Sequence, residues 1–383
     1  MAHRVLILGG GFGGIAAAVR LRELLDPADE IVLVDRRTHF FMGFRKTMAV
    51  IGREPLSDGS RPIASLASKG IRVAQTDVTR IDPAARAAEF DGDRFEADAL
   101  IVALGADVVP DAVPGLSEHG HNVYSADGVD GAAQGLATIE RGRVVVGIFG
   151  APYKCSPAPY ELALLGKEAT DARGAKTEWT VFTPQPMSIP VIGKGGCEAI
   201  EGRLAGNWID FRPNTKAERV ETGRVVLAAG GGDIPFDLLL AVPPHRVPVV
   251  VTEAGLAEKG GWVKVNPRTL ETSFEGVSAV GDVTGFPTAS GQPFPKAGVF
   301  AEREGLVVAE RIAARFAGRE PDTTFDGEGF CFLEAGNGEA MLVRGNFLAE
   351  PAPDVELTPP SREFYEQKTT FEREHLDAWF GPA

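Results

Sequence analysis

Short, continuous apolar runs separated by longer amphipathic stretches are the main pattern of the chain. One run covers residues 5–8 (VLIL), a helical stretch continues to residue 24, and a second run (EIVLVD) ends at Asp35. Similar runs occupy 99–106 (ALIVALGA) and 274–284 (FEGVSAVGDVT), and a long helix is expected after Pro295. Runs that are apolar at every position predict strands buried on both faces, as in a parallel sheet covered by helices.

The middle of the chain repeats this pattern and predicts a second sheet. Strands are expected at 143–149, 177–184 and 237–244, with a hairpin around 224–235. We therefore predict an α/β fold with two Rossmann-like dinucleotide-binding domains, the second inserted in the first. The expected boundaries are 1–107 and 253–318 for the first domain, 108–252 for the inserted domain, and 319–383 for a small C-terminal α+β piece.

Composition and charge exclude several classes of protein. Of 383 residues, 44% are hydrophobic and 24% are charged, which is ordinary for a globular protein. The net charge of −14 argues against nucleic acid and against broad attraction to anionic lipid. Three cysteines suit a reducing compartment, and no apolar run reaches the length of a membrane span. Because the first strand begins at Arg4, leaving no room for a signal peptide, we expect a cytoplasmic protein.

The turn after the first strand has a dinucleotide-binding pattern. Gly9, Gly11 and Gly14 fill the G-x-G-x-x-G positions, and Asp35 follows Gly14 by 21 residues. The glycines permit a tight turn and let backbone N–H groups approach a pyrophosphate at the positive end of the helix. The carboxylate at the end of the second strand can bind a ribose diol. This unit predicts a dinucleotide site without distinguishing FAD from NAD.

Three later segments resemble those of the glutathione-reductase-like flavoproteins, which carry two dinucleotide-binding domains. They are the strand that closes on Gly105, the Gly281-Asp282 pair, and the helix that follows Lys296. The resemblance implies FAD, with Asp282 at its ribityl chain. A lysine at a helix N-terminus would stabilise the negative charge of a reduced flavin, and the alternative for Lys296 is a solvated lysine at a helix start.

The corresponding turn of the inserted domain lacks the features of a nicotinamide site. It reads VVVGIFGAPYKC, with Gly147 and Gly150 followed by Ala151-Pro152. Proline offers no N–H to a phosphate and stiffens the loop. No acidic or basic residue that could bind a ribose closes the next strand, which ends in TVFTPQP. We therefore expect the electrons to come from a donor other than NADH or NADPH.

Cys155 lies in this turn, between Lys154 and Ser156-Pro157, before a helical run (APYELALLGKEA). With Ser156 as N-cap and Pro157 at the first helical position, the thiol would lie at a helix N-terminus beside a lysine. Both features lower the pKa of a thiol and favour the thiolate. We interpret Cys155 as a reactive cysteine, and the alternative is a buried, inert one.

The motifs YKCSPAPYE, FPKAGVFAEREG and CFLEAGNGEA make the chain similar to the sulfide:quinone oxidoreductases and, more distantly, to the flavoprotein subunit of flavocytochrome c sulfide dehydrogenase. The resemblance covers nearly the whole chain. It implies a redox-active pair of Cys155 and Cys331 beside the flavin, with Cys331 the nearer. Cys197 matches no family position and is interpreted as structural. The FAD contacts that the resemblance implies are Gly9, Gly11, Gly14, Asp35, Gly105, Asp282 and Lys296.

Two departures from the family pattern concern the cofactor. Segment 121–129 (HNVYSADGV) lacks the further cysteine that many members have, and no cysteine precedes Cys155. The FAD is therefore expected to be non-covalent, and no metal site is expected.

The substrates that the resemblance implies are sulfide and a quinone. Hydrosulfide would open the Cys155–Cys331 disulfide and leave one cysteine as a persulfide, while the other passes electrons to the flavin. Glu161 is either a base in this reaction or a favourable first-turn carboxylate. Residues 319–383 hold seven Phe, one Tyr and one Trp, which either line a slot for the quinone ring or pack on the first domain.

Membrane contact and assembly follow from less specific features. The last helix (362–380) is densely charged with both signs, whereas a helix that lies in a membrane surface is usually basic and more apolar. We expect at most weak peripheral contact, on the inner face of the membrane. We also expect a homo-oligomer.

Two other functions are compatible with this fold. One is an NADH-dependent flavin reductase similar to type II NADH dehydrogenases, and the altered second glycine turn argues against it. The other is a non-catalytic redox sensor, in which the Cys155–Cys331 pair would control the binding of a partner. Turnover with a soluble quinone would distinguish a sensor from an enzyme.

Overall fold

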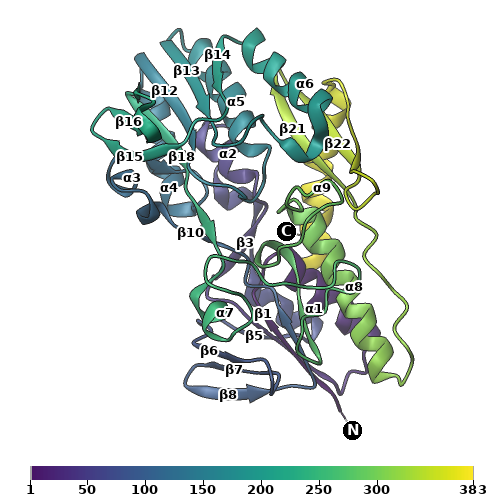
Figure 1. The fold of residues 1–383 in the computed structure, drawn as a ribbon. Coiled ribbons are helices and arrows are strands. Elements are labelled where there is room, and N and C mark those ends of the chain that lie inside the picture. The colour runs from purple at the N-terminus through teal and green to yellow at the C-terminus, as the bar shows by residue number, and fades with distance from the viewer. Residues whose placement is uncertain (1, 383) are drawn as a thin grey trace.

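A five-stranded parallel sheet lies in the half of the molecule that contains the N-terminus (Figure 1). The computed structural model describes residues 2–382. In sheet order the strands are β20 (Val277–Ala279), β9 (Ala99–Val102), β1 (Arg4–Leu8), β2 (Glu30–Val34) and β5 (Arg72–Ala74). Because β20 pairs in parallel with β9, the chain leaves this sheet and returns to it far along the sequence. This return confirms the predicted fold class.

Both faces of this sheet are covered, which explains why its strands are apolar at every position. Val5 and Ile7 of β1 belong to a core shared with two helices, α1 (Phe12–Leu24) and α8 (Gly298–Phe316). Leu6 and Leu8 point to the other face. That face packs on β6 (Arg80–Asp82), β7 (Ala87–Phe90), β8 (Asp93–Glu96) and α7 (Val249–Glu253).

A second five-stranded parallel sheet forms the other half of the molecule. Its order is β11 (His121–Asn122), β18 (Leu238–Val242), β12 (Arg141–Ile148), β13 (Lys176–Phe182) and β14 (Ile209–Arg212). Three helices accompany it, namely α4 (Ala126–Thr138), α5 (Ala158–Ala172) and α6 (Gly193–Gly206). The predicted strands at 143–149, 177–184 and 237–244 correspond to β12, β13 and β18.

Short antiparallel elements complete and connect the two halves. The predicted hairpin is part of a three-stranded sheet of β15 (Ala217–Glu221), β16 (Arg224–Leu227) and β17 (Asp233–Pro235). The two crossings between the halves pair as β10 (Asp107–Val108) and β19 (His245–Arg246). The remaining elements are β3 (His39–Phe41), β4 (Ser60–Pro62), α2 (Arg45–Val50) and α3 (Leu116–His119). The domain boundaries at 107, 252 and 318 stay a prediction.

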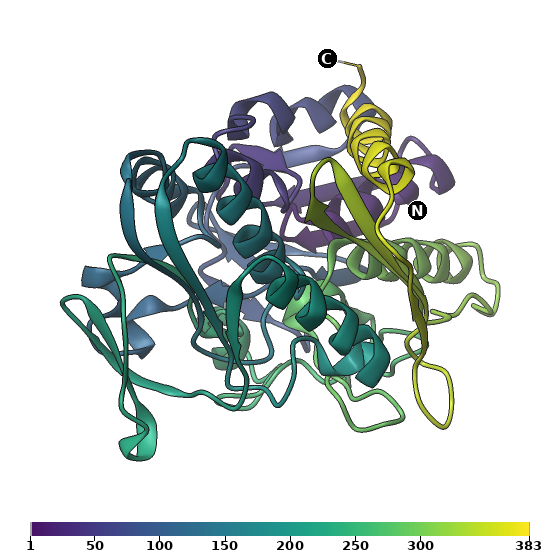
Figure 2. The same cartoon turned by 90° about the horizontal axis from the view of Figure 1, so that it is seen from above.

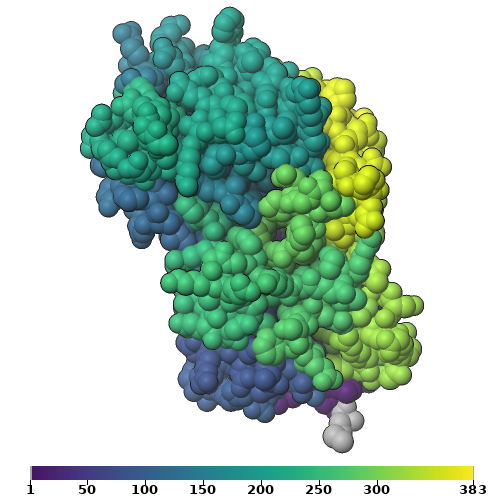
Figure 3. Space-filling view, in the orientation of Figure 1, coloured from purple at the N-terminus to yellow at the C-terminus, as the bar shows by residue number. Residues whose placement is uncertain are grey.

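The C-terminal piece packs against both halves. It consists of β21 (Glu328–Gly336), β22 (Glu339–Asn346), β23 (Asp354–Leu357) and α9 (Arg362–Phe380). Strand β21 contacts α5 and α8, and α9 contacts α1. Figure 2 shows this small sheet edge-on beside the helices of both halves, and Figure 3 shows the C-terminal residues covering one flank of the molecule. Cys331 lies on β21.

Among the helices of residues 2–382, none combines the length and the apolar character that crossing a bilayer requires.

Candidate functional site

A cleft of about 1310 Å³ lies where the two halves and the C-terminal piece meet. Its wall includes the ends of β1, β2 and β9, the first residues of α1 and α8, the turn before α5, and parts of β21 and α9. Pockets for drug-sized ligands measure about 300–1,000 Å³. The cleft can therefore hold a larger ligand together with a small substrate.

The glycine turn after β1 fits a pyrophosphate. Gly9 has a φ of +108°, and a Cβ there would lie 2.2 Å from the carbonyl oxygen of Ala103. A Cβ on Gly14 would lie 1.8 Å from the carbonyl oxygen of Gly9, so only glycine lets the helix start so close to the strand. Gly11 lines the cleft with open space in front of it. The first N–H groups of α1 are thereby presented to a ligand in the cleft.

Asp35 lies at the end of β2 and lines the same cleft. Its buried carboxylate accepts hydrogen bonds from the Gly10 N–H (2.5 Å), the Arg37 N–H (2.7 Å) and the Arg37 guanidinium. Burial raises the pKa of Asp35, but the hydrogen bonds and charge of Arg37 more than offset this and hold it below its ordinary value. Asp35 thus braces the glycine turn, and its contact with a ribose stays a prediction.

Lys296, which precedes α8, is not a solvated lysine, so that alternative is wrong. Its side chain is buried, and Nζ donates to the carbonyl oxygens of Asp282 (2.8 Å) and Thr284 (2.7 Å). The ammonium also lies 3.5 Å from the ring centre of Trp262. Burial lowers the pKa of Lys296 to about 8, with the charge of Asp282 acting in the opposite direction. Lys296, Asp282 and Gly105 all line the cleft.

Main-chain hydrogen bonds fix the turn that carries Cys155. The Cys155 N–H donates to the carbonyl oxygen of Lys296 at 2.7 Å, and Lys154 forms a parallel bridge with Lys296. The Tyr124 hydroxyl donates to the carbonyl oxygen of Cys155 at 3.0 Å. Cys155 has a φ of +53°, an uncommon conformation for a residue with a side chain. The turn of the inserted segment is thereby bound to the residue that precedes α8.

The helix cap predicted beside Cys155 is wrong in its details. Helix α5 begins at Ala158, with Pro157 rather than Ser156 at the N-cap position and no side-chain cap. The Ala158 N–H donates to the carbonyl oxygen of Cys155 at 3.0 Å. A main-chain carbonyl therefore accepts the hydrogen bond from the start of α5 that the Ser156 hydroxyl was expected to accept.

The predicted lowering of the Cys155 pKa is also wrong. Burial and the nearby carboxylate of Glu161 together raise the pKa of Cys155 to about 11. The ammonium groups of Lys46 and Lys368 act in the opposite direction without reversing the shift. The packing around the turn therefore outweighs the helix start and the neighbouring lysine on which the expectation was based.

Cys155 and Cys331 line one cleft although they are 176 residues apart in the sequence. Burial, and then the charge of a Cys155 thiolate, raise the pKa of Cys331 well above its ordinary value. Cys197 lies elsewhere: it is buried on α6, its thiol donates to the carbonyl oxygen of Ile189 at 3.2 Å, and it does not line the cleft.

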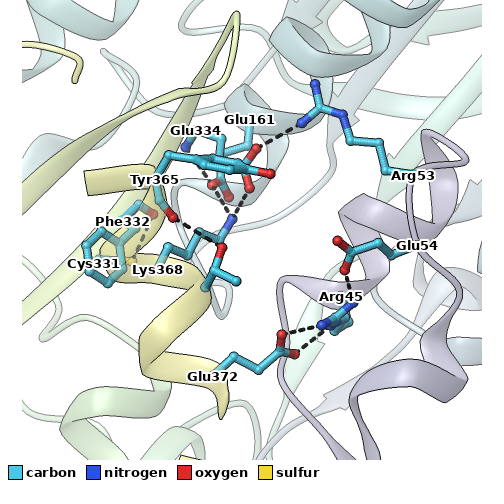
Figure 4. A network of polar contacts seen from close by, with 11 residues as sticks. Arg45, Arg53, Glu54, Glu161, Cys331, Phe332, Glu334, Tyr365, Lys368 and Glu372 are labelled. Carbon is cyan, nitrogen blue, oxygen red and sulfur yellow. Dashed lines mark hydrogen bonds and ion pairs between the residues drawn. The ribbon is translucent and has the colours of Figure 1, made fainter. Parts of the chain in front are cut away.

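A buried network of charges joins α5, β21 and α9 next to Cys331 (Figure 4). Lys368 of α9 donates to Glu334 at 2.7 Å and to Glu161 at 3.4 Å. Glu161 also accepts from the Glu334 N–H at 2.8 Å, and Arg53 reaches Glu334 at 3.2 Å. Burial raises the pKa of Glu161, and the charge of Lys368, which lowers it, does not reverse the shift. The Glu161 carboxylate is therefore bound to Lys368 and β21, and not to the N–H groups of its own helix.

Two groups stand out among the aromatic side chains of the C-terminal piece. Phe325 is buried against Phe294, and Phe347 against Phe300 of α8, as the packing alternative predicts. Phe330, Phe332 and Phe371 instead line the cleft. The Phe330 and Phe371 rings meet edge to face with centres 5.6 Å apart. The same three rings line a second groove of about 880 Å³ between the small sheet and α9.

The glycine turn of the inserted segment packs against aromatic rings. A Cβ on Gly147 would lie 2.7 Å from the Phe182 ring, which itself stacks edge to face with Phe149 at 5.2 Å. Tyr153, just beyond the turn, is also buried. The space in front of Gly147 is therefore filled by an aromatic ring, whereas Gly11 of the first glycine turn faces open space.

Sequence reasoning missed three charged residues of the site, namely Lys46, Glu334 and Lys368. Lys368 left a signal, because it lies four residues after Phe364 and three before Phe371, on the apolar stripe of the last helix. Lys46 follows an aromatic segment, FFMGFR, which is an unusual setting for a lysine. Glu334 alternates with apolar residues on β21 and gave no signal of its own.

Comparisons with known proteins match most of the chain. A family model described as "Pyridine nucleotide-disulphide oxidoreductase" matches residues 3–305. "Sulfide:quinone oxidoreductase, mitochondrial" of Mus musculus is 24% identical over 368 residues, covering 91% of this chain and 79% of the relative. "Sulfide-quinone reductase" of Aquifex aeolicus is 28% identical over 334 residues, covering 82% and 76%. The solved structure of the sulfide:quinone oxidoreductase from Aquifex aeolicus has a TM-score of 0.89 and 25% identity, covering 100% of this chain and 92% of that chain.

Proposed function

The chain belongs to the pyridine nucleotide-disulphide oxidoreductase family, and on this basis we propose that it is an FAD-dependent enzyme that oxidises sulfide and passes two electrons to a quinone. One observation carries the proposal: a single cleft contains the glycine turn of β1, the start of α8, Cys155 and Cys331. A dinucleotide site and a cysteine pair at the same cavity are the parts that such a reaction needs.

The residues of the cleft fit FAD. The N–H groups at the start of α1 would hold the pyrophosphate, as the open space at Gly11 permits. Asp282 would contact the ribityl chain, and the start of α8 with Lys296 would face the flavin ring. The remaining contacts that we propose are Gly9, Gly14, Asp35 and Gly105. When bound, FAD supplies the two-electron acceptor between the sulfur chemistry and the quinone.

The sulfur chemistry takes place on Cys155 and Cys331. Hydrosulfide attacks one sulfur of their disulfide, so that a new S–S bond forms, the bond between the cysteines breaks, and one persulfide and one thiolate result. A second hydrosulfide removes the outer sulfur as HS–S⁻ and leaves two reduced cysteines. Re-formation of the disulfide releases one proton and the two electrons that reach the quinone. The quinone takes up two protons, of which one comes from solvent.

We place the quinone ring at Phe330, Phe332 and Phe371. These rings line both the cleft and the groove of about 880 Å³, so a flat apolar molecule could enter from the groove and reach the inner cleft. Their arrangement supports the quinone-slot interpretation for these three rings only.

Location and assembly complete the proposal. We propose a cytoplasmic protein with weak peripheral contact on the inner face of the membrane, and a homo-oligomer. The charged surface of α9 supports contact that is weak, since a surface-bound helix would be more apolar.

Acid precipitation is expected to release all of the FAD from the purified protein. The reason is that the first cysteine of the chain is Cys155, and segment 121–129 has none to bind the flavin covalently. The flavin absorbance of the supernatant and of the redissolved protein measures this. Yellow colour retained on the denatured chain would contradict the non-covalent assignment.

Sulfide is expected to reduce the bound flavin at least about a hundred-fold faster than NADH or NADPH at equal micromolar concentration. The reason is that the second glycine turn is unsuited to bind a nucleotide phosphate, because Pro152 has no N–H to donate and Gly147 packs on Phe182. Anaerobic titration with sulfide and then with NADH, observing the flavin band, makes the comparison.

Two results would overturn the proposal, one from this titration and one from a turnover assay with a soluble quinone. Rapid bleaching by NADH would favour the nicotinamide-dependent reductase. Flavin reduction by sulfide without steady-state turnover of a soluble quinone would favour the redox sensor.

A further inference from the structure

Lys46 on α2 and Lys154 before Cys155 line the cleft without a carboxylate partner. Two other cations of the cleft are paired: Arg37 with Asp35, and Lys368 with Glu161. Within residues 2–382, no carboxylate oxygen lies within 4.0 Å of the Nζ of Lys46 or Lys154. Both lysines are half-buried, and a ligand that fills the cleft would remove their charges from water, which is costly unless the charges are paired. Lys296 of the same cleft has two carbonyl oxygens as partners, whereas the ammonium groups of Lys46 and Lys154 point to an anion that binds beside them.

The fold fixes the two lysines independently of each other. Lys154 is held through its main chain, which bridges Lys296 in the turn that positions Cys155. Lys46 lies on the short helix α2, which packs on α4 and α5, and its Nζ lies 5.1 Å from the ring centre of Phe41. The two ammonium groups therefore approach the cleft from separate elements of the fold.

The charges around Lys46 indicate where the missing anion would lie. Burial, the charge of Lys154 and the charge of Arg37 together lower the pKa of Lys46 to about 8. A Cys155 thiolate and Asp282 are the groups that favour the charged form. A thiolate is thus one of the two anions in the cleft that stabilise this ammonium.

The surroundings of Lys154 follow the same pattern. Burial lowers its pKa, Arg37 lowers it too, and Asp282, a Cys155 thiolate and Asp107 raise it. The influence on Cys155 is reciprocal, because Lys46 is the main cation that lowers the pKa of its thiol. Two other charged groups face that thiol: Glu161, which raises its pKa, and Lys368, which lowers it.

We propose that Lys46 and Lys154 form a binding site for anionic sulfur at Cys155. The pair would hold hydrosulfide as it attacks, and then the thiolate or persulfide anion that remains on Cys155. This inference rests on the proposed function and adds to it two residues that select an anionic sulfur nucleophile over a neutral one. The site offsets part of the effect of burial, which raises the pKa of the Cys155 thiol.

The test uses a protein in which Cys155 is the only cysteine, made with Cys197→Ser and Cys331→Ser. The rate of alkylation by iodoacetamide is measured against pH, with FAD bound and after its removal. Loss of a cation close to a thiol raises the pKa of that thiol by about one unit or more. Lys46→Gln and Lys154→Gln are therefore each expected to lower the alkylation rate at pH 7, where the Lys46 ammonium is charged, about ten-fold, because less thiolate is present.

Controls separate charge from structure. Lys46→Arg keeps the charge and is expected to restore most of the rate. Lys194→Gln, at an exposed lysine of α6, is expected to change nothing. If Lys46→Gln does not fold, Lys154→Gln carries the test alone, since the main-chain bridge of residue 154 does not depend on its side chain. In the protein with all cysteines, Lys46→Gln should raise the KM for sulfide more than it lowers kcat.

Two outcomes would overturn the inference. Unchanged alkylation together with weaker FAD binding would mean that the lysines hold the phosphates of the cofactor. Unchanged alkylation and unchanged FAD binding would mean that they hold no anion. Neither measurement uses sulfide or a quinone, so this inference can fail while the proposed function stands, and the reverse also holds.

Discussion

Replacing Cys155 or Cys331 by Ser is expected to abolish the reduction of the flavin by sulfide, with a loss of about a thousand-fold or more in each case. The disulfide between them is the electrophile of the proposed reaction, so either half is indispensable. The double variant should be no worse than either single variant, because residues that act as one unit give losses that do not add. Stopped-flow measurement of flavin bleaching under anaerobic conditions tests both points.

Two controls show whether the loss belongs to the disulfide. Cys197→Ser is expected to keep most activity, since Cys197 lies on α6 away from the cleft. Light-reduced flavin in the inactive variants should still be reoxidised by quinone, because that half-reaction needs no thiol. A dead Cys197 variant with an active Cys331 variant would mean that the wrong cysteines are paired. Full sulfide activity in all three would end the redox-disulfide mechanism.

Lys368→Met is expected to destabilise the protein by about 3–5 kcal/mol, the range observed when one partner of a buried ion pair is removed. The side chains of Lys368, Glu161 and Glu334 are only 5%, 2% and 4% exposed, so two carboxylates would remain buried with one cation fewer. Urea unfolding measures the change. As a matched control, Lys167→Met removes a lysine whose partner Asp171 is 52% exposed, and should cost less than about 1 kcal/mol.

The pH dependence of Lys368→Met identifies the cause of the loss. Burial raises the pKa of Glu161 above its unfolded value already in the native protein, and removal of the ammonium raises it further. A carboxyl group with a raised folded pKa binds more protons when folded, so its contribution to stability is lost as pH rises. The Lys368→Met variant should therefore regain stability as the pH falls from 7 to 5. Adding Glu161→Gln should recover part of the loss at pH 7, and a loss unaffected by pH or by Glu161→Gln would contradict a charge-based cause.

The sequence predicted the features that depend on neighbours along the chain. The strand, the glycine turn and Asp35 are close in sequence; Gly9 and Gly14 have a steric reason within the chain, and Gly11 leaves open space for a ligand. The last helix was predicted with its bounds because it has a clear apolar stripe. The meeting of Cys155 with Cys331 could not be derived locally, and only the family resemblance suggested it.

Burial explains why the chemistry of Cys155 was predicted with the wrong sign. The helix start and Lys154 are visible in the sequence, and both favour a thiolate. The charged side chains that act on the thiol come from α2, α5 and α9, and the desolvation of the thiol is a property of the folded chain. The network of Lys368, Glu161 and Glu334 escaped prediction for the same reason, since its members lie far apart in the sequence.

The hydrogen bond from the Cys155 N–H to the Lys296 carbonyl also affects how such a site can change over time. Both bonding groups belong to the main chain, so the side chains at 154 and 296 are not involved, and at position 155 a proline would remove the donor. The main chain therefore sets the position of the sulfur, whereas the side chain of residue 154 sets the charge beside it. A substitution at 154 would change that charge without displacing Cys155 from its place beside α8. Related proteins could in this way come to act on sulfur substrates of different charge while the thiol keeps its place.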